Sequence, residues 1–155
     1  VLFGDATPSG KLPITLPEDD ADMIGPIDGE VKYTEGLATS YRSPSLKAAY
    51  PFGHGLSYAS FRVDTPRYAN CYGIPCLQVN VTNTHSKYVG REVVQAYVHN
   101  APSSGLPSLM LQSFAKTGTL KPGGWEEVWM RLYDLPAGSE IHVGCSAGDL
   151  RHKVR

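Results

Sequence analysis

The segment Leu77-Gln78-Val79-Asn80-Val81-Thr82-Asn83 alternates apolar and polar side chains along its whole length. Side chains of a β-strand point to opposite faces in turn, so this period of two is typical of a strand with one face in a core and one in solvent. We predict a strand over residues 77–83 that buries Leu77, Val79 and Val81.

The same alternation recurs on both sides of this segment, and turn-forming residues separate the alternating runs. The clearest turn is Lys121-Pro122-Gly123-Gly124, which leads into a run that alternates from Trp125 to Leu132. The further predicted strands cover residues 58–64, 92–99, 109–116, 125–132, 140–145 and 150–154. We place Val128, Met130, Leu132, Ile141, Val143 and Cys145 in the core. Six or seven short strands at this spacing predict an all-β fold, a fibronectin-III-like or immunoglobulin-like β-sandwich.

Residues 1–57 show no comparable periodicity. Four prolines within the first 30 residues exclude a long helix there, and residues 11–16 alternate weakly, as a short strand or an extended arm does. Residues 31–57 form an irregular segment with several apolar side chains, which we expect to contact either the sandwich or a partner. We therefore expect an extended, irregular N-terminal arm and linker in front of the sandwich.

The composition argues against two classes of function, nucleic-acid binding and membrane spanning. The 155 residues are 41% apolar and carry a net charge of −1. The basic residues are scattered, without the dense patch of a nucleic-acid binder. No apolar stretch approaches the roughly 20 residues that cross a bilayer. We expect neither a nucleic-acid partner nor a membrane span.

The cysteines and one glycosylation motif favour a secretory route. Cys71 and Cys76 flank a segment in which Gly73 and Pro75 allow the chain to turn back, so we predict a disulfide between them. Cys145 is then a buried free thiol. Asn80-Val81-Thr82 is an N-glycosylation sequon, which makes Asn80 a candidate glycosylation site. The alternative is three reduced thiols and a chance sequon.

Six blocks along the chain resemble, in order, the C-terminal part of family 3 glycoside hydrolases. The most specific is Tyr50-Pro51-Phe52-Gly53-His54-Gly55-Leu56-Ser57-Tyr58, which is similar to the junction before the terminal sandwich of that family. The others cover residues 8–15, 33–37 with 41–42, 79–84 with 90–98, 120–123, and 143–144 with 149–151. The chain departs from the family pattern at Ser40, where a Gly is usual, and at Ser43-Pro44-Ser45, where further aromatic residues and an Asp are usual.

The resemblance implies a domain plan. Residues 1–30 correspond to the tail of an upstream α/β catalytic domain, residues 31–57 to a linker, and residues 58–155 to a fibronectin type III-like β-sandwich. It also implies that the parent is a retaining β-glucosidase whose two catalytic carboxyl groups both lie upstream of this chain. We therefore expect no catalytic residue here, and we expect the upstream domains or chain of the same glycosidase to be the partner.

Three residues are weak candidates for a substrate site. Glu35 lies in the linker, and we favour an ion pair with Arg42 over a role near a catalytic pocket. Trp125 and Trp129 share the outward face of a predicted strand with Glu127, and could stack on sugar rings. For both tryptophans we favour packing against the linker.

The sequence indicates no cofactor and no metal. It has no Gly-rich phosphate loop and no pair of His or Cys at metal-binding spacing. The acidic run Glu18-Asp19-Asp20-Ala21-Asp22 lacks the spacing of a calcium loop. Besides the favoured role as a non-catalytic brace, two hypotheses stay open: a scaffold subunit docked on a larger assembly, and a carbohydrate-binding module.

Overall fold

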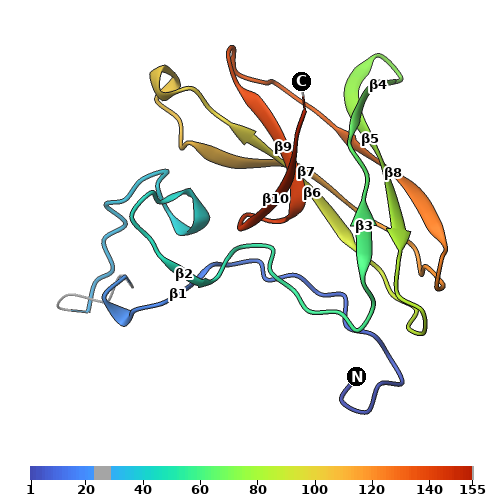
Figure 1. The fold of residues 1–155 in the computed structure, drawn as a ribbon. Coiled ribbons are helices and arrows are strands. Elements are labelled where there is room, and N and C mark those ends of the chain that lie inside the picture. Colours follow the sequence, from blue (N-terminus) through green and yellow to red (C-terminus); the bar gives the residue numbers. More distant parts are fainter. Residues whose placement is uncertain (23–28, 155) are drawn as a thin grey trace.

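The computed structural model describes residues 1–22 and 29–154. Two antiparallel β-sheets pack face to face, and the N-terminal third of the chain lies along one side of them (Figure 1). The predicted all-β sandwich with a preceding arm and linker is confirmed. Regular structure outside the strands is limited, in the described residues, to three single-turn 3-10 segments.

The first sheet is built around one long central strand. Its strands are β3 (Phe61–Val63), β4 (Arg67–Cys71), β5 (Ile74–Asn83) and β8 (Trp125–Arg131). Strands β3 and β4 pair with the two halves of one edge of β5, and β8 pairs with the other edge from Cys76 to Thr82. The predicted strand 77–83 is therefore the centre of this sheet, since it has a neighbour on each side.

The second sheet has the order β10-β9-β6-β7. Its strands are β6 (Val93–His99), β7 (Leu109–Lys116), β9 (Glu140–Ser146) and β10 (Asp149–Val154). All four pair antiparallel. The single turn η3 (Pro102–Ser104) lies in the connection between β6 and β7.

The core lies between the two sheets. The predicted inward residues of β5, β8 and β9, and Leu132 directly after β8, are all buried: Leu77, Val79, Val81, Val128, Met130, Leu132, Ile141, Val143 and Cys145. Val94 and Ala96 of β6 join the same cluster. Interdigitated aliphatic side chains from two inner faces are the main source of stability in such a sandwich.

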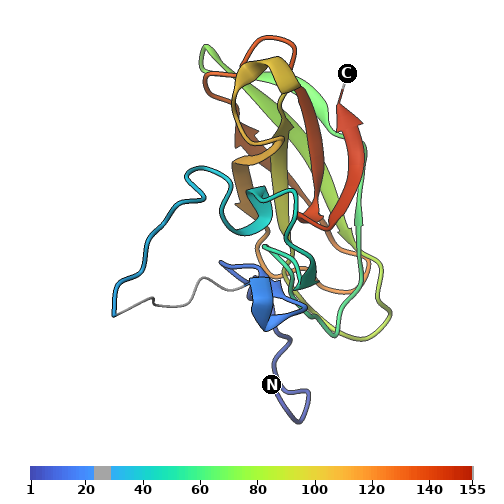
Figure 2. The same ribbon diagram turned by 90° about the vertical axis from the view of Figure 1, so that its left-hand side faces the viewer.

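The arm and linker form a small layer of their own. Strand β1 (Leu16–Pro17) pairs antiparallel with β2 (Ala48–Tyr50), and the single turns η1 (Asp20–Asp22) and η2 (Ser40–Arg42) lie between them in sequence. Figure 2 shows η2 in front of the second sheet, whereas the part of the linker before η2 loops out to the side of the sandwich. The predicted short strand of the arm is thus reduced to two residues and a few loop hydrogen bonds.

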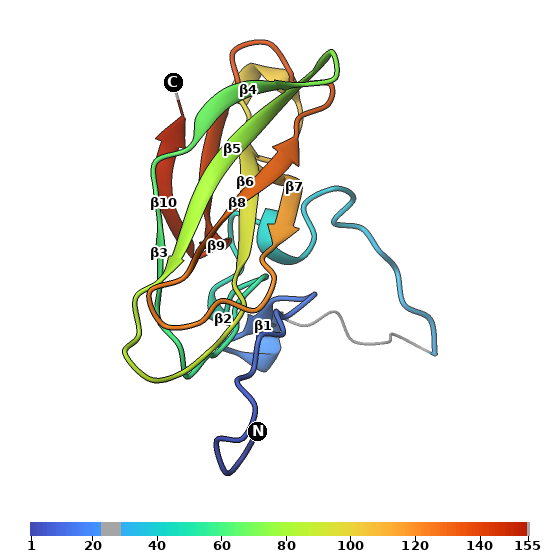
Figure 3. The same ribbon diagram turned by 90° about the vertical axis from the view of Figure 1, so that its right-hand side faces the viewer.

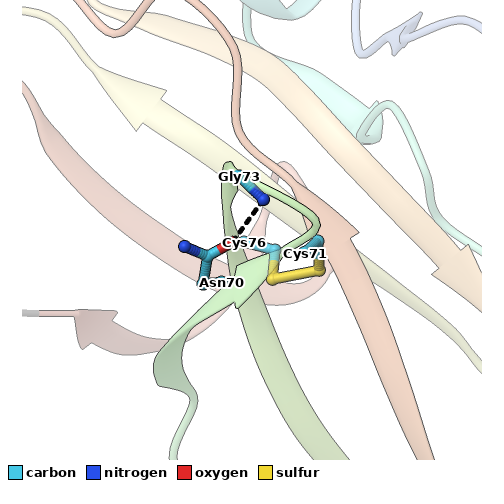
Figure 4. The surroundings of a disulfide bond; sticks show 4 residues. All are labelled: Asn70, Cys71, Gly73 and Cys76. Carbon is cyan, nitrogen blue, oxygen red and sulfur yellow. Dashed lines mark hydrogen bonds between the residues drawn. A yellow bond between two sulfur atoms is a disulfide. The ribbon is translucent and has the colours of Figure 1, made fainter.

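A disulfide joins Cys71 and Cys76 at one end of the first sheet (Figure 4). Tyr72 and Gly73 both have positive φ, as the two central residues of a type I′ hairpin turn require. The Gly73 amide donates to the side-chain oxygen of Asn70 at 2.6 Å. Cys145 is free and buried, as predicted, and desolvation by burial raises its pKa to about 12.

Candidate functional site: the arm and linker on the second sheet

The arm and the linker hold each other through backbone hydrogen bonds. The Leu12 amide donates to the His54 carbonyl at 2.8 Å, and the Gly53 amide donates to the Leu12 carbonyl at 2.8 Å. The amide of Glu18 donates to the carbonyl of Lys47 at 3.0 Å. Two segments that are roughly thirty to forty positions apart in sequence therefore run side by side as one antiparallel ribbon.

The two glycines that flank His54 allow this ribbon to approach its neighbours closely. Gly53 has φ of +79°, and a Cβ there would lie 2.3 Å from the side-chain oxygen of Gln95 in β6. A Cβ on Gly55 would lie 2.3 Å from the carbonyl oxygen of Gly10 in the arm. The motif Gly53-His54-Gly55 is thus a contact point, at which the linker touches both the sandwich and the arm.

An aromatic cluster anchors the linker to β6. The ring centroids of Tyr41 and Phe52 are 4.6 Å apart, and the Tyr41 ring meets the edge of Tyr97 at 5.9 Å. The Leu111 amide of β7 donates to the Tyr41 hydroxyl oxygen at 2.9 Å. The Ala147 amide, between β9 and β10, donates to the Phe52 carbonyl at 2.9 Å. The linker therefore contacts three parts of the second sheet.

This covering layer changes the environment of β6. Val94 to Val98 are all buried, including Gln95 and Tyr97, which point away from the sandwich core. The Tyr97 hydroxyl donates to the Gln95 side-chain oxygen. Burial, with a smaller effect of Tyr41, raises the pKa of Tyr97 well above its ordinary value, so this hydroxyl stays protonated. We predicted one buried face for this strand, and the structure shows two.

A charged pair fixes the arm to the start of β6. The Lys11 ammonium lies 2.8 Å from the Glu92 carboxylate, and both side chains are mostly buried, at 16% and 12% exposure. Nearby, the Lys116 ammonium donates to the Ser9 carbonyl at 3.1 Å. Because a nearly buried ion pair depends on geometry, these contacts specify where the arm lies.

Ser40, which stands where the resemblance described above predicts a Gly, occupies a backbone conformation that favours Gly. Its φ is +56°, in the left-handed region that side chains disfavour. The Ser40 hydroxyl compensates in part, since it donates to the Thr15 hydroxyl at 3.1 Å and accepts from the Thr15 amide at 3.3 Å. The serine thus ties η2 to the arm.

Glu35 and Arg42 line one groove of about 490 Å³, together with Leu37 and the loop before β7. The described residues show no ion pair between the two, contrary to our prediction. One carboxylate oxygen of Glu35 and Nε of Arg42 are buried without a hydrogen-bond partner. The groove therefore contains two oppositely charged side chains that each retain hydrogen-bonding capacity.

The two tryptophans do not pack against the linker, so our favoured interpretation of them is wrong. Trp125 is 65% exposed and Trp129 is 46% exposed, on the outer face of the first sheet. The linker covers the second sheet, on the opposite side of the sandwich, as Figures 2 and 3 show. Asn80 lies on the same outer face as the tryptophans, directly across from Glu127.

The described residues contain no group of three or more metal-ligating side chains and no helix that could span a membrane. The acidic run of the arm ends in the single turn η1. The structure thus offers the arm and linker interface, the groove at Glu35 and Arg42, and the outer face of the first sheet as candidate sites.

Comparison with known proteins shows which family the chain belongs to. Residues 1–58 match the glycosyl hydrolase family 3 C-terminal domain. A β-glucosidase of Rhizobium radiobacter is 32% identical over 99% of this chain and 22% of its own length. A β-xylosidase of Formosa agariphila is 35% identical over 97% of this chain and 24% of its own length. The chain spans about a quarter of the length of these curated relatives.

Solved structures agree with this placement. A β-glucosidase from Paenibacillus barengoltzii superimposes with a TM-score of 0.83 at 33% identity, over 100% of this chain and 20% of its own. A β-glucosidase from Thermotoga neapolitana in complex with glucose superimposes with a TM-score of 0.85 at 31% identity, over 99% and 25%. The chain is thus similar, over nearly its whole length, to one region of glycoside hydrolases. It belongs to glycosyl hydrolase family 3 and corresponds to the C-terminal region of its members.

Proposed function

We propose that this chain is the non-catalytic brace of a family 3 β-glucosidase-type enzyme, with a sandwich of the fibronectin type III kind. The parent would hydrolyse terminal β-D-glucosyl residues with retention, and its upstream domains would carry both catalytic carboxyl groups. Retaining hydrolysis needs two such groups about 5 Å apart. In this proposal none of the carboxylates of this chain takes that role.

The observation that carries the proposal is that the arm and linker contact the sandwich on one side and expose apolar side chains on the other. One side is tied to the sandwich by Gly53, Tyr41 and Lys11, as described above. The other side leaves large apolar side chains in solvent, of which Tyr33 is 77% exposed and Leu37 is 55% exposed. Exposed apolar residues that cluster on one segment mark an interaction surface.

The grooves along this segment point to the same surface. One of about 530 Å³ runs past Ile14, Leu16, Tyr33 and Glu35, and it adjoins the groove with the unpartnered atoms of Glu35 and Arg42. Upstream catalytic domains would supply apolar contacts to the first groove and hydrogen-bond partners to the second. The sandwich would then hold those domains at a fixed position through a rigid ribbon.

We further propose that the protein passes through an oxidising, secretory compartment and is extracellular. The disulfide of Cys71 and Cys76 supports this, because disulfides persist mainly in such compartments. The sequon at Asn80, which is exposed, adds to it. Treatment of the native protein with a thiol-alkylating reagent before and after reduction, followed by intact-mass measurement, tests the oxidation state directly.

The experiment that tests the brace compares the natural protein containing this chain with the isolated chain. Both are assayed with aryl β-D-glucosides and aryl β-D-xylosides, since the relatives include both activities. We expect hydrolysis by the natural protein and none by the chain. Turnover by the pure chain that is lost on Glu35→Gln would contradict the proposal.

A variant tests the bracing itself. In the natural protein, Tyr33→Ala should shorten the half-life of activity on heating, because an apolar contact to the upstream domains is lost. Tyr68→Ala is the matched control, since Tyr68 is half exposed on the first sheet. An equal effect of the two variants, or a natural assembly of the chain with proteins unrelated to glycosidases, favours the scaffold hypothesis instead.

A further inference from the structure

The outer face of the first sheet has a regular layout that the brace does not use. In its rows, Trp125 lies across from Thr82, Glu127 from Asn80, and Trp129 from Gln78. Arg67 of β4 continues the row of Gln78 on the other side of β5. Figure 3 looks onto this sheet, and neither the arm nor the linker crosses it.

Aromatic side chains mark the two ends of this face. Trp125 and Trp129 are separated by about 13 Å along β8 at ~3.3 Å per residue. Tyr72, at the tip of the β4–β5 hairpin, is almost fully exposed and lines a hollow of about 590 Å³ together with Trp129 and Arg131. This side of the first sheet therefore presents three exposed aromatic rings, of which Tyr72 and Trp129 share a hollow.

Planar polar groups fill the space between the tryptophans. Gln78, Asn80 and Glu127 line a second hollow of about 520 Å³ with Asp64 and Arg67. The Gln78 amide group donates to the Glu127 carboxylate, and Arg62 holds Asp64 at 2.8 Å. These contacts fix the orientation of the amide and carboxylate groups, so that they are ready to bond a ligand.

The charges on this face are close to balanced. The basic side chains are Arg62, Arg67 and Arg131, and the acidic ones are Asp64 and Glu127. A phosphate backbone needs a strongly basic surface, and a basic peptide needs an acidic one. The complementary ligand is therefore neutral, with many hydroxyl groups and with apolar ring faces that can stack on indole.

We propose that this face binds a short neutral oligosaccharide. Its sugar rings stack on Trp125 and Trp129, and its hydroxyl groups bond Gln78, Asn80 and Glu127 between them. Sugar rings have an apolar face formed by C–H groups, which suits an aromatic platform. The distance between the tryptophans favours an oligosaccharide over a single sugar.

This site does not depend on the brace. The arm and linker lie over the second sheet, so upstream domains docked on them leave the first sheet open (Figures 1 and 3). Bound oligosaccharide would hold the protein on a carbohydrate polymer. Failure of the brace proposal would leave this site untouched, because the binding is measured on the chain alone.

A glycan attached to Asn80 would compete with added oligosaccharide for this site. The Asn80 side chain is exposed in the middle of the face, and Thr82 of the same sequon points to the same side. A glycan attached to Asn80 would extend over this face and occupy the hollow that Asn80 lines. The test must therefore distinguish added oligosaccharide from an attached glycan.

The test titrates the full 155-residue chain, produced in a bacterial host that attaches no N-glycan, with cellotetraose and with xylotetraose. Amide chemical shifts and tryptophan emission report the binding. We expect shifts at Gln78, Asn80 and Glu127, and a loss of affinity of at least about tenfold, or about 1.4 kcal/mol, for Trp129→Ala. Trp125→Ala should cause a similar loss of affinity.

Phe114→Ala is the matched control, since Phe114 of the second sheet is as exposed as Trp125, at 65%. Absence of saturable binding, or equal loss with Phe114→Ala, overturns the proposal. The same titration on chain made in a eukaryotic secretory host distinguishes the sources. If a chain with an Asn80 glycan no longer binds and its tryptophans are already shielded, the face serves that glycan, which also overturns the proposal.

Discussion

The two outer faces of the sandwich differ in one respect. Parts of the arm and linker, among them Lys11, Tyr41 and Gly53, lie against the outer face of the second sheet, whereas the first sheet is open. Strand β6 therefore buries Gln95 and Tyr97 as well as its core residues, while β8 exposes Trp125 and Trp129. The arm and linker thus act as a third layer, which packs on the outer side of β6.

The largest expected effect is that of Gly53→Ala. The alanine would have to hold a positive φ, and its Cβ would displace the end of the buried Gln95 side chain from its hydrogen bond with Tyr97, so we expect a loss of about 3 kcal/mol in unfolding free energy. Gly105→Ala is the control, because Gly105 also has positive φ but has open space around it, and about 1 kcal/mol is expected. Urea denaturation measures the unfolding free energy of both variants. Equal losses would mean that the linker does not pack closely against β6.

The second effect compares two ion pairs, one on each face. Lys11→Met leaves the mostly buried Glu92 without its partner, and we expect a loss of about 2 kcal/mol. Arg62→Met breaks an exposed pair with Asp64 on the open face, and a loss below about 0.5 kcal/mol is expected. The difference should persist in 1 M salt, where exposed pairs are screened. Similar small losses for both variants would indicate that the arm is not docked.

A smaller effect is expected for Tyr41→Phe. The ring contacts with Phe52 and Tyr97 are retained, but the amide of Leu111 loses its acceptor, which should cost about 1 kcal/mol. Thermal denaturation measures the change. Tyr50→Phe is a suitable control, since Tyr50 is half exposed and its hydroxyl is not needed for these contacts. No difference between the two variants would argue against the hydrogen bond.

The smallest effect is expected on the open face. Trp129→Ala removes a half-exposed ring from the outer face of β8, and we expect a change in unfolding free energy within about 0.5 kcal/mol. Circular dichroism during urea denaturation checks this. A loss of 2 kcal/mol or more would mean that the ring is part of a packed layer, and the contrast between the faces would then fail.

Much of the sandwich could be predicted from alternation alone. The inward residues of β5, β8 and β9 follow the period of two, because each of these strands faces the core on one side only. Strand β6 does not follow the period of two, because the linker covers its outer face and both of its faces are buried. The nearly continuous apolar run from Val93 to Val98 is the signal for this, as such runs are typical of strands that are covered on both sides.

The placement of the side chains on the two faces could not be predicted in the same way. Alternation shows that Trp125 and Trp129 point outward, but not which sheet β8 joins, and this alone decides whether the linker can reach them. The expected ion pair of Glu35 and Arg42 was based on closeness in sequence. The pairing of arm and linker depends on contacts between residues roughly thirty to forty positions apart, which local patterns do not encode.

The most direct test of the central claim is native-state hydrogen exchange of the backbone amides of Leu12 and Gly53. Both amides donate across the ribbon of arm and linker. If this ribbon folds as one unit with the sandwich, both amides should exchange with the same opening free energy as those of β6. Rapid exchange of Leu12 and Gly53, with β6 still protected, would contradict the claim, since the arm and linker would then be a loose attachment.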